Sequence, residues 1–369
     1  KFSVNQKDLQ NSLNYCQGVI EKRSTLPILS NVLLEAKNDN LKITATDLDL
    51  IFIQNISNIK ISEEGETTTS CSIMYDIVRK FNNEKKIEFN LVNENKINVE
   101  SDKSSFNLNC LKASEFPLTE SNFSENEFKL NSKQLLKLLN KCKFSISNDE
   151  TRHYLSGIFL HLTDNENKKY LTAVATDSHR MAVSKILLAD EINFEPIILP
   201  KKTIFQLCSL LDDYNGDVII SNLKSKIKFE FNNIILISKL IDGKFPNYFQ
   251  VIPKDNQKKL EIDLKPFLTS VDRVASVSLD KKDGLRMSLA NDNLDLSVNS
   301  SNSGDGNESL PVKFAHELEI SFNPRYLIDV ASILDGNKIE IYLKESGSPA
   351  LIKDPSDFDS IYVIMPMKG

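Results

Sequence analysis

Residues that build disulfide frameworks and metal sites are scarce in this sequence. The 369 residues include 5 cysteines and 4 histidines. The cysteine count is odd and no Cys-Xaa-Xaa-Cys pair occurs, which argues against both a disulfide framework and a zinc site. No histidine lies three or four residues from another histidine or a cysteine, the spacing typical of metal ligands on one element. We therefore expect reduced thiols, no metal and no cofactor.

Long apolar runs and an excess of positive charge are also missing. No apolar run approaches the roughly 18 residues that span a bilayer, and residues 1–9 alternate and carry charge, unlike a secretory signal. We expect a cytoplasmic protein without a membrane partner. The net charge is -6, whereas DNA-binding domains usually carry a basic excess. Any interaction with DNA must then come from a locally basic surface or from topology.

Motifs of the common catalytic sites are absent as well. The sequence has no Gly-Xaa-Ser-Xaa-Gly elbow, no P-loop and no Gly-Xaa-Gly-Xaa-Xaa-Gly turn. Asp177, Ser178 and His179 do place an acid, a hydroxyl and an imidazole side by side. Adjacent residues of a strand point to opposite faces, however, and catalytic triads are assembled from distant segments. We therefore do not expect an enzyme.

What the sequence does contain is internal repetition. Residues 4–9, 130–135 and 262–267 share a pattern typical of the entry to a helix. The residues four and seven positions beyond the end of each segment are apolar, as on one buried helix face. These residues are Leu13 and Cys16, Leu139 and Cys142, and Val271 and Val274. Cys16 and Cys142 are therefore predicted to occupy equivalent core positions.

Each repeat continues with the same succession of elements. Strand pairs joined by polar turns are predicted at 32–34 with 41–47, 158–162 with 170–177, and 285–289 with 294–298. Second helices are predicted at 73–81, 202–211 and 324–334, the last with Gly336 as its stop signal. Alternating strands follow at 87–91, 227–231 and 339–343. The predicted fold is α+β, with three repeated domains of two helices packed on antiparallel sheet.

The expected domains span residues 1–120, 128–250 and 256–369. Their boundaries are predicted in two polar stretches, at 119–127 and 253–259. The tripeptide Ala-Thr-Asp occurs at 45–47 in the first domain and returns at 175–177 in the second.

Four longer segments identify a family. They are RSTLPIL at 23–29, ATDSHRMAV at 175–183, SKLIDGKFP at 238–246 and YVIMPMK at 362–368. With these segments in order, the chain resembles the bacterial DNA polymerase III beta subunit, the beta sliding clamp, along essentially its whole length. The resemblance implies the DNA clamp fold and a head-to-tail homodimer, closed into a ring that encircles duplex DNA of any sequence. It also implies DNA polymerase III, other polymerases and the clamp loader as partners, at the nucleoid.

The resemblance further implies a pocket between the second and third domains that captures peptides from these partners. Residues at the matching positions are Leu155, Thr176, His179, Arg180, Met181, Pro246, Val251, Asn323, Tyr326, Val363, Ile364, Met365, Pro366 and Met367. Methionines suit a surface that accepts several partners. The alternative is that residues 363–367 form an ordinary buried last strand, although Pro366 favours an edge or the surface.

Three positions depart from the family pattern at this pocket. Ser178 stands where glycine is common, and Gln250 and Lys368 stand where arginine is common. The apolar floor is unaffected, but the preference for particular peptides is left open.

For DNA contact the resemblance implies Arg23, His153 and Tyr154. Arg23 and Tyr154 match the family, whereas His153 replaces a tyrosine. Asp149, at a further family position, replaces a glutamine and would repel phosphate. The alternative for Arg23 is a solvated loop arginine.

Lysines at helical spacing add to the expected DNA surface. Lys133, Lys137 and Lys141 share one helix face, and we expect Lys137 and Lys141 to face phosphates. The alternative is that this stripe is simply a solvated helix face.

The resemblance also implies a dimer interface between the first and third domains. Phe106 and Leu108 match the family on one side, while Ser276 and Val277 stand where bulkier aliphatic residues are usual. Each lost side chain could remove roughly 1 to 3 kcal/mol of burial, so we expect a dimer weaker than the family norm.

The alternative function is a repeat-built scaffold that binds proteins without encircling DNA. Such a scaffold would need no basic face, so reversing the charge of Lys137 and Lys141 would leave it unaffected.

Overall fold

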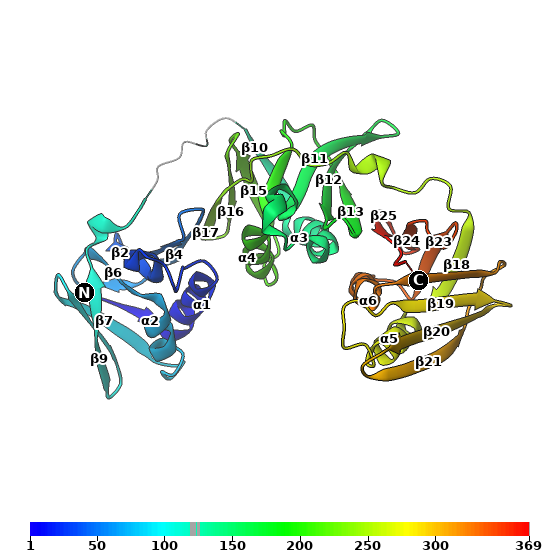
Figure 1. Cartoon of the computed structure of the whole chain (residues 1–369). Helices are drawn as coiled ribbons and strands as arrows, with labels where there is room; N and C mark the ends of the chain where they lie inside the picture. Colours follow the sequence, from blue (N-terminus) through cyan, green and yellow to red (C-terminus); the bar gives the residue numbers. More distant parts are fainter. Residues whose placement is uncertain (119–122, 124–125, 369) are drawn as a thin grey trace. The chain divides into compact units, whose positions relative to one another are not determined.

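The computed structural model (Figure 1) describes residues 1–118, 123 and 126–368. The chain divides into two compact units. Unit 1 comprises residues 1–136 and 202–240, and unit 2 comprises residues 137–201 and 241–369. Each unit combines part of the middle third of the chain with one outer third. The predicted boundary at 119–127 lies largely outside the described residues.

Unit 1 is built on one antiparallel sheet. Its strands are β1 (Phe2–Asn5), β2 (Asn31–Lys37), β3 (Asn40–Thr46), β4 (Leu50–Ser57), β5 (Lys60–Ile61), β6 (Gly65–Ser70), β7 (Lys86–Asn93), β8 (Lys96–Ser101), β9 (Ser104–Leu111), β10 (Glu127–Asn131), β15 (Asp217–Asn222), β16 (Lys226–Phe231) and β17 (Ile234–Lys239). The order of the 13 strands is β10-β15-β16-β17-β4-β3-β2-β6-β9-β8-β7-β1-β5. Along β16, buried Ile227, Phe229 and Phe231 alternate with half-buried residues, as the period of two predicted.

Unit 2 contains two antiparallel sheets. Its strands are β11 (Gly157–Asn165), β12 (Lys168–Thr176), β13 (Arg180–Leu187), β14 (Ile197–Pro200), β18 (Lys258–Asp263), β19 (Leu285–Ala290), β20 (Asn293–Ser300), β21 (Gly304–Pro311), β22 (Leu318–Phe322), β23 (Lys338–Leu343), β24 (Ala350–Asp354) and β25 (Asp357–Ile364). Eight strands follow the order β14-β11-β12-β13-β25-β24-β23-β18, and four follow β21-β20-β19-β22. The β13–β25 ladder therefore joins the middle third of the chain to its last third in one continuous sheet.

The helices bury the faces that their repeat pattern predicts. They are α1 (Gln6–Gln17), α2 (Cys71–Val78), α3 (Ser132–Cys142), α4 (Lys201–Leu211), α5 (Leu264–Ala275) and α6 (Pro324–Ile333). Leu13 and Cys16 in α1, Leu139 and Cys142 in α3, and Val271 and Val274 in α5 are all buried, as the predicted helix faces require. Helices α1 and α2 pack against each other in unit 1, as α5 and α6 do in unit 2. The fold is therefore α+β, as predicted.

Four predicted helix ends differ from the structure: both ends of α2, and, by one residue each, the start of α4 and the end of α6. Helix α2 begins at Cys71 because the Ser70 hydroxyl accepts a hydrogen bond from the backbone N–H of Ile73 and caps the helix. Helix α6 ends at Ile333, and the next residue is already extended, so Gly336 is not its stop signal. Gly336 is required for a close approach instead, because a Cβ atom there would lie 2.6 Å from Oδ1 of Asp354.

Within the described ranges, no helix combines the length and the apolar composition that crossing a membrane requires.

Candidate functional site

The turn between β12 and β13 is fixed by its own side chains. The Thr176 hydroxyl donates to the carbonyl of Arg180 at 2.7 Å and accepts from the N–H of Ser178 at 3.1 Å. Oδ1 of Asp177 accepts from the N–H groups of His179, at 2.9 Å, and of Arg180, at 3.0 Å. Ser178 has a φ of 77°, in the left-handed region that glycine adopts most easily. The tripeptide Ala-Thr-Asp thus encodes a tight turn, not a catalytic relay.

The same turn recurs between β3 and β4. The Thr46 hydroxyl contacts the carbonyl of Leu50 and the N–H of Leu48, and Oδ1 of Asp47 accepts from the N–H of Leu50. Leu48 has a φ of 79°. The repeated tripeptide therefore marks a duplicated structural element, in which Leu48 and Ser178 hold the same strained conformation.

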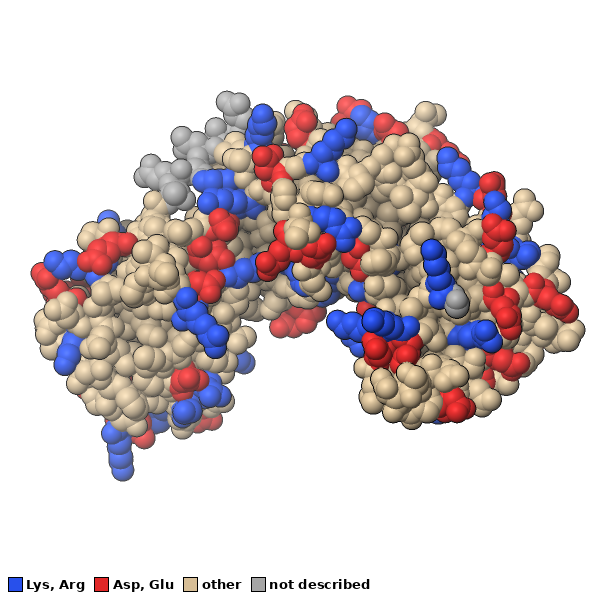
Figure 2. Space-filling view, in the orientation of Figure 1, with Lys and Arg blue, Asp and Glu red and all other residues tan. Residues whose placement is uncertain are grey.

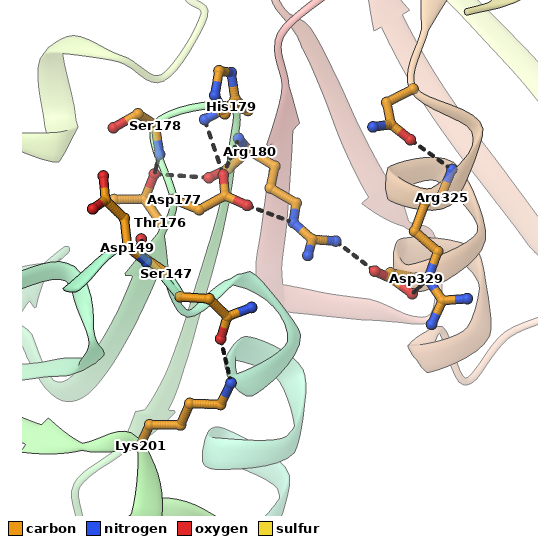
Figure 3. A network of polar contacts seen from close by, with 12 residues as sticks. Ser147, Asp149, Thr176, Asp177, Ser178, His179, Arg180, Lys201, Arg325 and Asp329 are labelled. Atoms are coloured by element: carbon orange, nitrogen blue, oxygen red, sulfur yellow. Dashed lines mark hydrogen bonds and ion pairs between the residues drawn. The ribbon is translucent and has the colours of Figure 1, made fainter. Parts of the chain in front are cut away.

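Arg180 extends from its turn to helix α6 (Figure 3). Its Nε lies 3.1 Å from Oδ2 of Asp177, and its Nη1 lies 2.6 Å from Oδ2 of Asp329. The guanidinium carbon lies 4.4 Å from the ring centroid of Tyr326 and 5.3 Å from that of Phe144. Burial, followed by the charge of Asp177, raises the pKa of Tyr326. These charged and aromatic contacts fix the turn against α6.

An apolar cluster lies behind this turn. In the β13–β25 ladder Met181 pairs with Val363, and Arg180 pairs with Ile364. The buried members of the apolar cluster are Leu155, Val174, Met181, Val183, Ile198, Phe245, Tyr248, Leu351 and Val363. The structure thus brings residues from four distant parts of the chain into one core.

The fourteen residues expected in the peptide pocket differ in exposure. Leu155, Met181, Val363 and Ile364 are buried; Thr176, Arg180, Asn323, Tyr326, Pro366 and Met367 are half-buried; and His179, Pro246, Val251 and Met365 are exposed. Val363 and Ile364 belong to the end of β25, so the alternative of a buried last strand is correct for these two.

Beyond β25 the chain stays at the surface. The N–H of Met365 donates to the carbonyl of His179 at 2.9 Å, and that of Met367 donates to the carbonyl of Ser321 at 2.8 Å. The Asn323 side chain caps α6 by accepting from the N–H of Arg325 at 2.9 Å. The buried residues form the floor of a surface on which His179 and Met365 are exposed.

The expected DNA contacts belong to both units. Arg23 is exposed in unit 1. His153 and Tyr154 lie in unit 2, in the short 3-10 helix Glu150–Leu155, where their rings meet edge to face. Nε2 of His153 lies 3.0 Å from the carbonyl oxygen of Asp242.

The carboxylate of Asp149 is hydrogen-bonded to neighbouring residues of its own segment. Its Oδ1 accepts hydrogen bonds from the hydroxyl and the N–H of Thr151, and its Oδ2 accepts from Nε of Arg152 at 2.9 Å. These hydrogen bonds lower the pKa of Asp149, and the bond from the Thr151 hydroxyl contributes most to that shift. The carboxylate thus caps the 3-10 helix.

Lys141 corrects the expected lysine stripe. Lys133 and Lys137 are exposed, but Lys141 is 4% exposed. Its Nζ lies 2.8 Å from Oδ2 of Asp335 and 2.5 Å from the carbonyl oxygen of Ile333, at the end of α6. The ammonium group of Lys141 is paired with a carboxylate and with a carbonyl at the end of a helix. Lys141 is therefore a helix-capping residue and not a surface cation that faces phosphate. Lys137 remains accessible, with Nζ 3.5 Å from Oδ1 of Asp357.

The residues expected at the dimer interface lie on or beside strand edges. Phe106 is 39% exposed and Leu108 is half-buried on β9, which pairs with β6 only through Cys110 and Leu111 in the described part of the chain. In unit 2, Ser276 is exposed and Val277 is half-buried just after α5. Val277 packs near Gly306 of β21, the last strand of the four-stranded sheet.

Neither charges of one sign, on the face in view in Figure 2, nor possible metal ligands, in the described part of the chain, are gathered at one place. Figure 2 shows Lys and Arg interspersed with Asp and Glu on the face in view. All five cysteines are buried, and burial raises the pKa of the Cys142 thiol. Across residues 1–118 and 126–368, no three His, Cys, Asp or Glu side chains are grouped so that they could hold a metal ion.

Sequence reasoning missed several residues that shape this site. Asp329 and Phe144 hold Arg180, and Phe245 and Tyr248 complete the apolar floor. The repeated Ala-Thr-Asp tripeptide was a signal for Asp177, but no local pattern distinguishes Asp329 from other helix carboxylates.

Three family domains match the chain in succession. They are the N-terminal domain of the DNA polymerase III beta subunit over residues 1–120, its central domain over 129–247 and its C-terminal domain over 249–368. The beta sliding clamp of Caulobacter vibrioides is 34% identical over 371 residues, covering 100% of both chains. That of Rickettsia felis is 34% identical and covers 100% of this chain and 99% of the relative.

Solved structures agree with these matches. A sliding clamp from Bartonella birtlesii, bound to griselimycin, has a TM-score of 0.96 and 34% identity, covering 100% of this chain and 99% of that one. A sliding clamp from Pseudomonas aeruginosa, also bound to griselimycin, has a TM-score of 0.93 and 31% identity, with coverage of 100% and 99%. The chain therefore belongs to the DNA polymerase III beta subunit family, the beta sliding clamps.

Proposed function

We propose that two copies of this chain close head to tail into a ring around duplex DNA and bind partner peptides at the surface around Met181 and Met365. The chain is a sliding clamp for DNA polymerase III and not an enzyme. Its proposed peptide partners are DNA polymerase III, other polymerases and the clamp loader. Its proposed place of action is the cytoplasm, on the DNA of the nucleoid.

The observation that carries the peptide proposal is the β13–β25 ladder with its Arg180 bridge. The ladder pairs Met181 with Val363 and so provides a rigid apolar floor, while Arg180 holds the neighbouring turn against α6. A preformed floor bordered by exposed Met365, Val251 and His179 reduces the entropy lost when a peptide binds. The clamps of Bartonella birtlesii and Pseudomonas aeruginosa with bound griselimycin provide a competitor for the same test.

Fluorescence anisotropy with overlapping short peptides tiled over the polymerase III catalytic subunit of the same genome tests this proposal. We expect at least one peptide to bind and to be displaced by griselimycin. His179→Ala and Met365→Ala should each weaken its binding by about 5-fold or more. Phe358→Ala is the matched control, because Phe358 is 90% exposed on β25 and outside the proposed surface. If no tiled peptide binds the wild type, the peptide proposal is wrong.

The proposed ring rests on two strand edges of opposite units. Residues 104–109 of β9 pair with β8 on one side, and β21 ends its sheet, so β9 of one copy can add to β21 of a second. Negative-stain electron microscopy at micromolar concentration should show hollow rings of dimer size. Globules or open crescents at every concentration would overturn encirclement.

The side chains at the proposed interface favour a weak association of the two copies. Ser276 and Val277 offer little apolar area opposite Phe106 and Leu108, so we propose that dimers dissociate at nanomolar concentration. Analytical sedimentation measures this directly, and a dimer without detectable monomer at nanomolar concentration would contradict it.

A further inference from the structure

Five aromatic rings form a continuous chain of ring contacts, three of them stacked and one edge to face, beside the proposed peptide surface. Phe245 stacks on Phe159 with ring centroids 4.8 Å apart, and Phe159 stacks on His161 at 4.6 Å. His161 meets Tyr248 edge to face at 5.5 Å, and Tyr248 stacks on Phe249 at 4.3 Å. The chain of ring contacts begins in the buried apolar cluster, through Phe245, and ends at the surface.

The inner members hold the outer ring in place. Tyr248 is 3% exposed, and its hydroxyl lies 2.7 Å from Nε2 of His161. Burial lowers the pKa of His161 and raises that of Tyr248, so the pair is neutral and linked by a hydrogen bond at neutral pH. Phe249 therefore stacks on a ring that is fixed by packing and by a polar contact.

Phe249 leaves about half of its surface free. It is 52% exposed, and it lies in the short 3-10 helix Tyr248–Gln250 between Pro246 and Val251. Pro246 and Val251, both exposed, are positions of the proposed peptide surface. The apolar area thus continues from the floor under Met181 to the outer ring of Phe249.

We propose that Phe249 forms an additional subsite that accepts an aromatic side chain of the bound partner peptide, next to the residues that contact the apolar floor. The inference rests on the proposed peptide function. Aromatic pairs gain energy beyond their buried area, and a ring already held by stacking loses little freedom on binding.

The charge of the segment favours an aromatic ring over an arginine as the occupant. Residues 245–251 read Phe-Pro-Asn-Tyr-Phe-Gln-Val and carry no charged side chain. A guanidinium stacked on Phe249 would lose hydration without a carboxylate from this segment to pair with it. An aromatic side chain has no such requirement.

A double-mutant cycle tests the subsite. The tightest peptide of the tiled set is synthesised with phenylalanine, leucine or arginine at each position flanking its apolar anchors, and each version is titrated against wild type, Phe249→Ala and Phe249→Tyr. At one position we expect phenylalanine to bind about 3- to 10-fold more tightly than leucine to wild type and to Phe249→Tyr. In Phe249→Ala that preference should vanish.

The outcomes separate the subsite from the peptide function beneath it. If the tiled peptide binds wild type but its phenylalanine preference is absent, or persists in Phe249→Ala, the subsite is wrong while the peptide function stands. A gain for arginine in place of phenylalanine also overturns the subsite. If no tiled peptide binds, both proposals fail. Circular dichroism of Phe249→Ala and the unaltered binding of the leucine peptide show that the variant is folded.

Discussion

Arg180 in the β12–β13 turn and Asp329 in α6 form an ion pair with 2.6 Å between Nη1 and Oδ2. The two residues are 149 positions apart in the sequence. Their side chains are 12% and 19% exposed, so the pair is largely shielded from water. The pair joins two repeats of the chain at the proposed peptide surface.

Asp329→Asn should destabilise unit 2 strongly, because it leaves the shielded charge of Arg180 with one carboxylate fewer. We expect a loss of about 3 kcal/mol, the lower end of the range for breaking a buried pair. Arg325→Ala is the matched control, since its pair with Asp329 involves a side chain that is 75% exposed and should contribute at most about 1 kcal/mol. Urea denaturation measures both variants, and equal losses would contradict the assigned role of Arg180.

Ser178→Gly should stabilise the protein, even though it removes the hydrogen bond that the Ser178 hydroxyl accepts from Nη1 of Arg152 at 2.5 Å. A left-handed conformation costs a non-glycine residue roughly 1 to 2 kcal/mol, and glycine removes that cost. Leu48→Gly should act in the same direction, because Leu48 has a φ of 79° in the equivalent turn. Ser297→Gly, within β20, is the control and should lose about 0.5 to 1 kcal/mol. Melting temperatures that fall for both turn variants would refute the assigned strain.

Lys141→Ala and Lys137→Ala should have opposite consequences. Lys141 is buried against Asp335 and the end of α6, so its removal should cost about 1 to 3 kcal/mol of stability. Lys137 is exposed, and its contact with the buried carboxylate of Asp357 is long, at 3.5 Å, so its removal should cost less stability than that of Lys141 but should weaken salt-dependent retention on DNA. Urea denaturation and the salt dependence of DNA retention distinguish the two. An unchanged stability of Lys141→Ala would contradict its assigned role at the end of α6.

Asp354→Asn should destabilise unit 2 in a pH-dependent way. Asp354 is 2% exposed, and its carboxylate accepts hydrogen bonds from the N–H groups of Asp335 and Gly336 and from the N–H and hydroxyl of Ser356. Burial alone would raise the pKa of Asp354, but these hydrogen bonds hold it below its ordinary value.

The folded state therefore favours the ionised carboxylate of Asp354. Its contribution is complete above the unfolded pKa of about 3.9 and is lost as the pH falls through the lower folded pKa. At neutral pH we expect Asp354→Asn to lose about 1 to 3 kcal/mol. The difference from wild type should shrink below about pH 3.9 in urea titrations. A constant difference across that range would contradict the pKa shift.

The sequence predicted the repeated elements well because short-range patterns decide them. The apolar face of α1 through Leu13 and Cys16 follows from helical spacing, and the alternation of β16 follows from a period of two. Helix ends were less predictable. The start of α2 depends on the Ser70 cap, and Gly336 serves packing against Asp354 and not the end of α6.

The residues of the site could be predicted from the sequence, but their arrangement in space could not. The resemblance named Arg180, Met181 and Val363, whereas their arrangement depends on the β13–β25 register and on Asp329. Lys141 shows the limit most clearly, because its spacing with Lys137 predicted a common surface. The partner that buries it, Asp335, lies almost two hundred residues away.

By itself the sequence determined the α+β repeats, the duplicated Thr-Asp turns and the family. These depend on residue spacing and local hydrogen bonds, which a chain carries wherever it folds. Tertiary structure alone decided which charges are shielded, as for Arg180 and Lys141, and which aromatic ring ends exposed, as for Phe249. Burial and charge pairing depend on residues that are distant in sequence, so they are settled only when the sheets join.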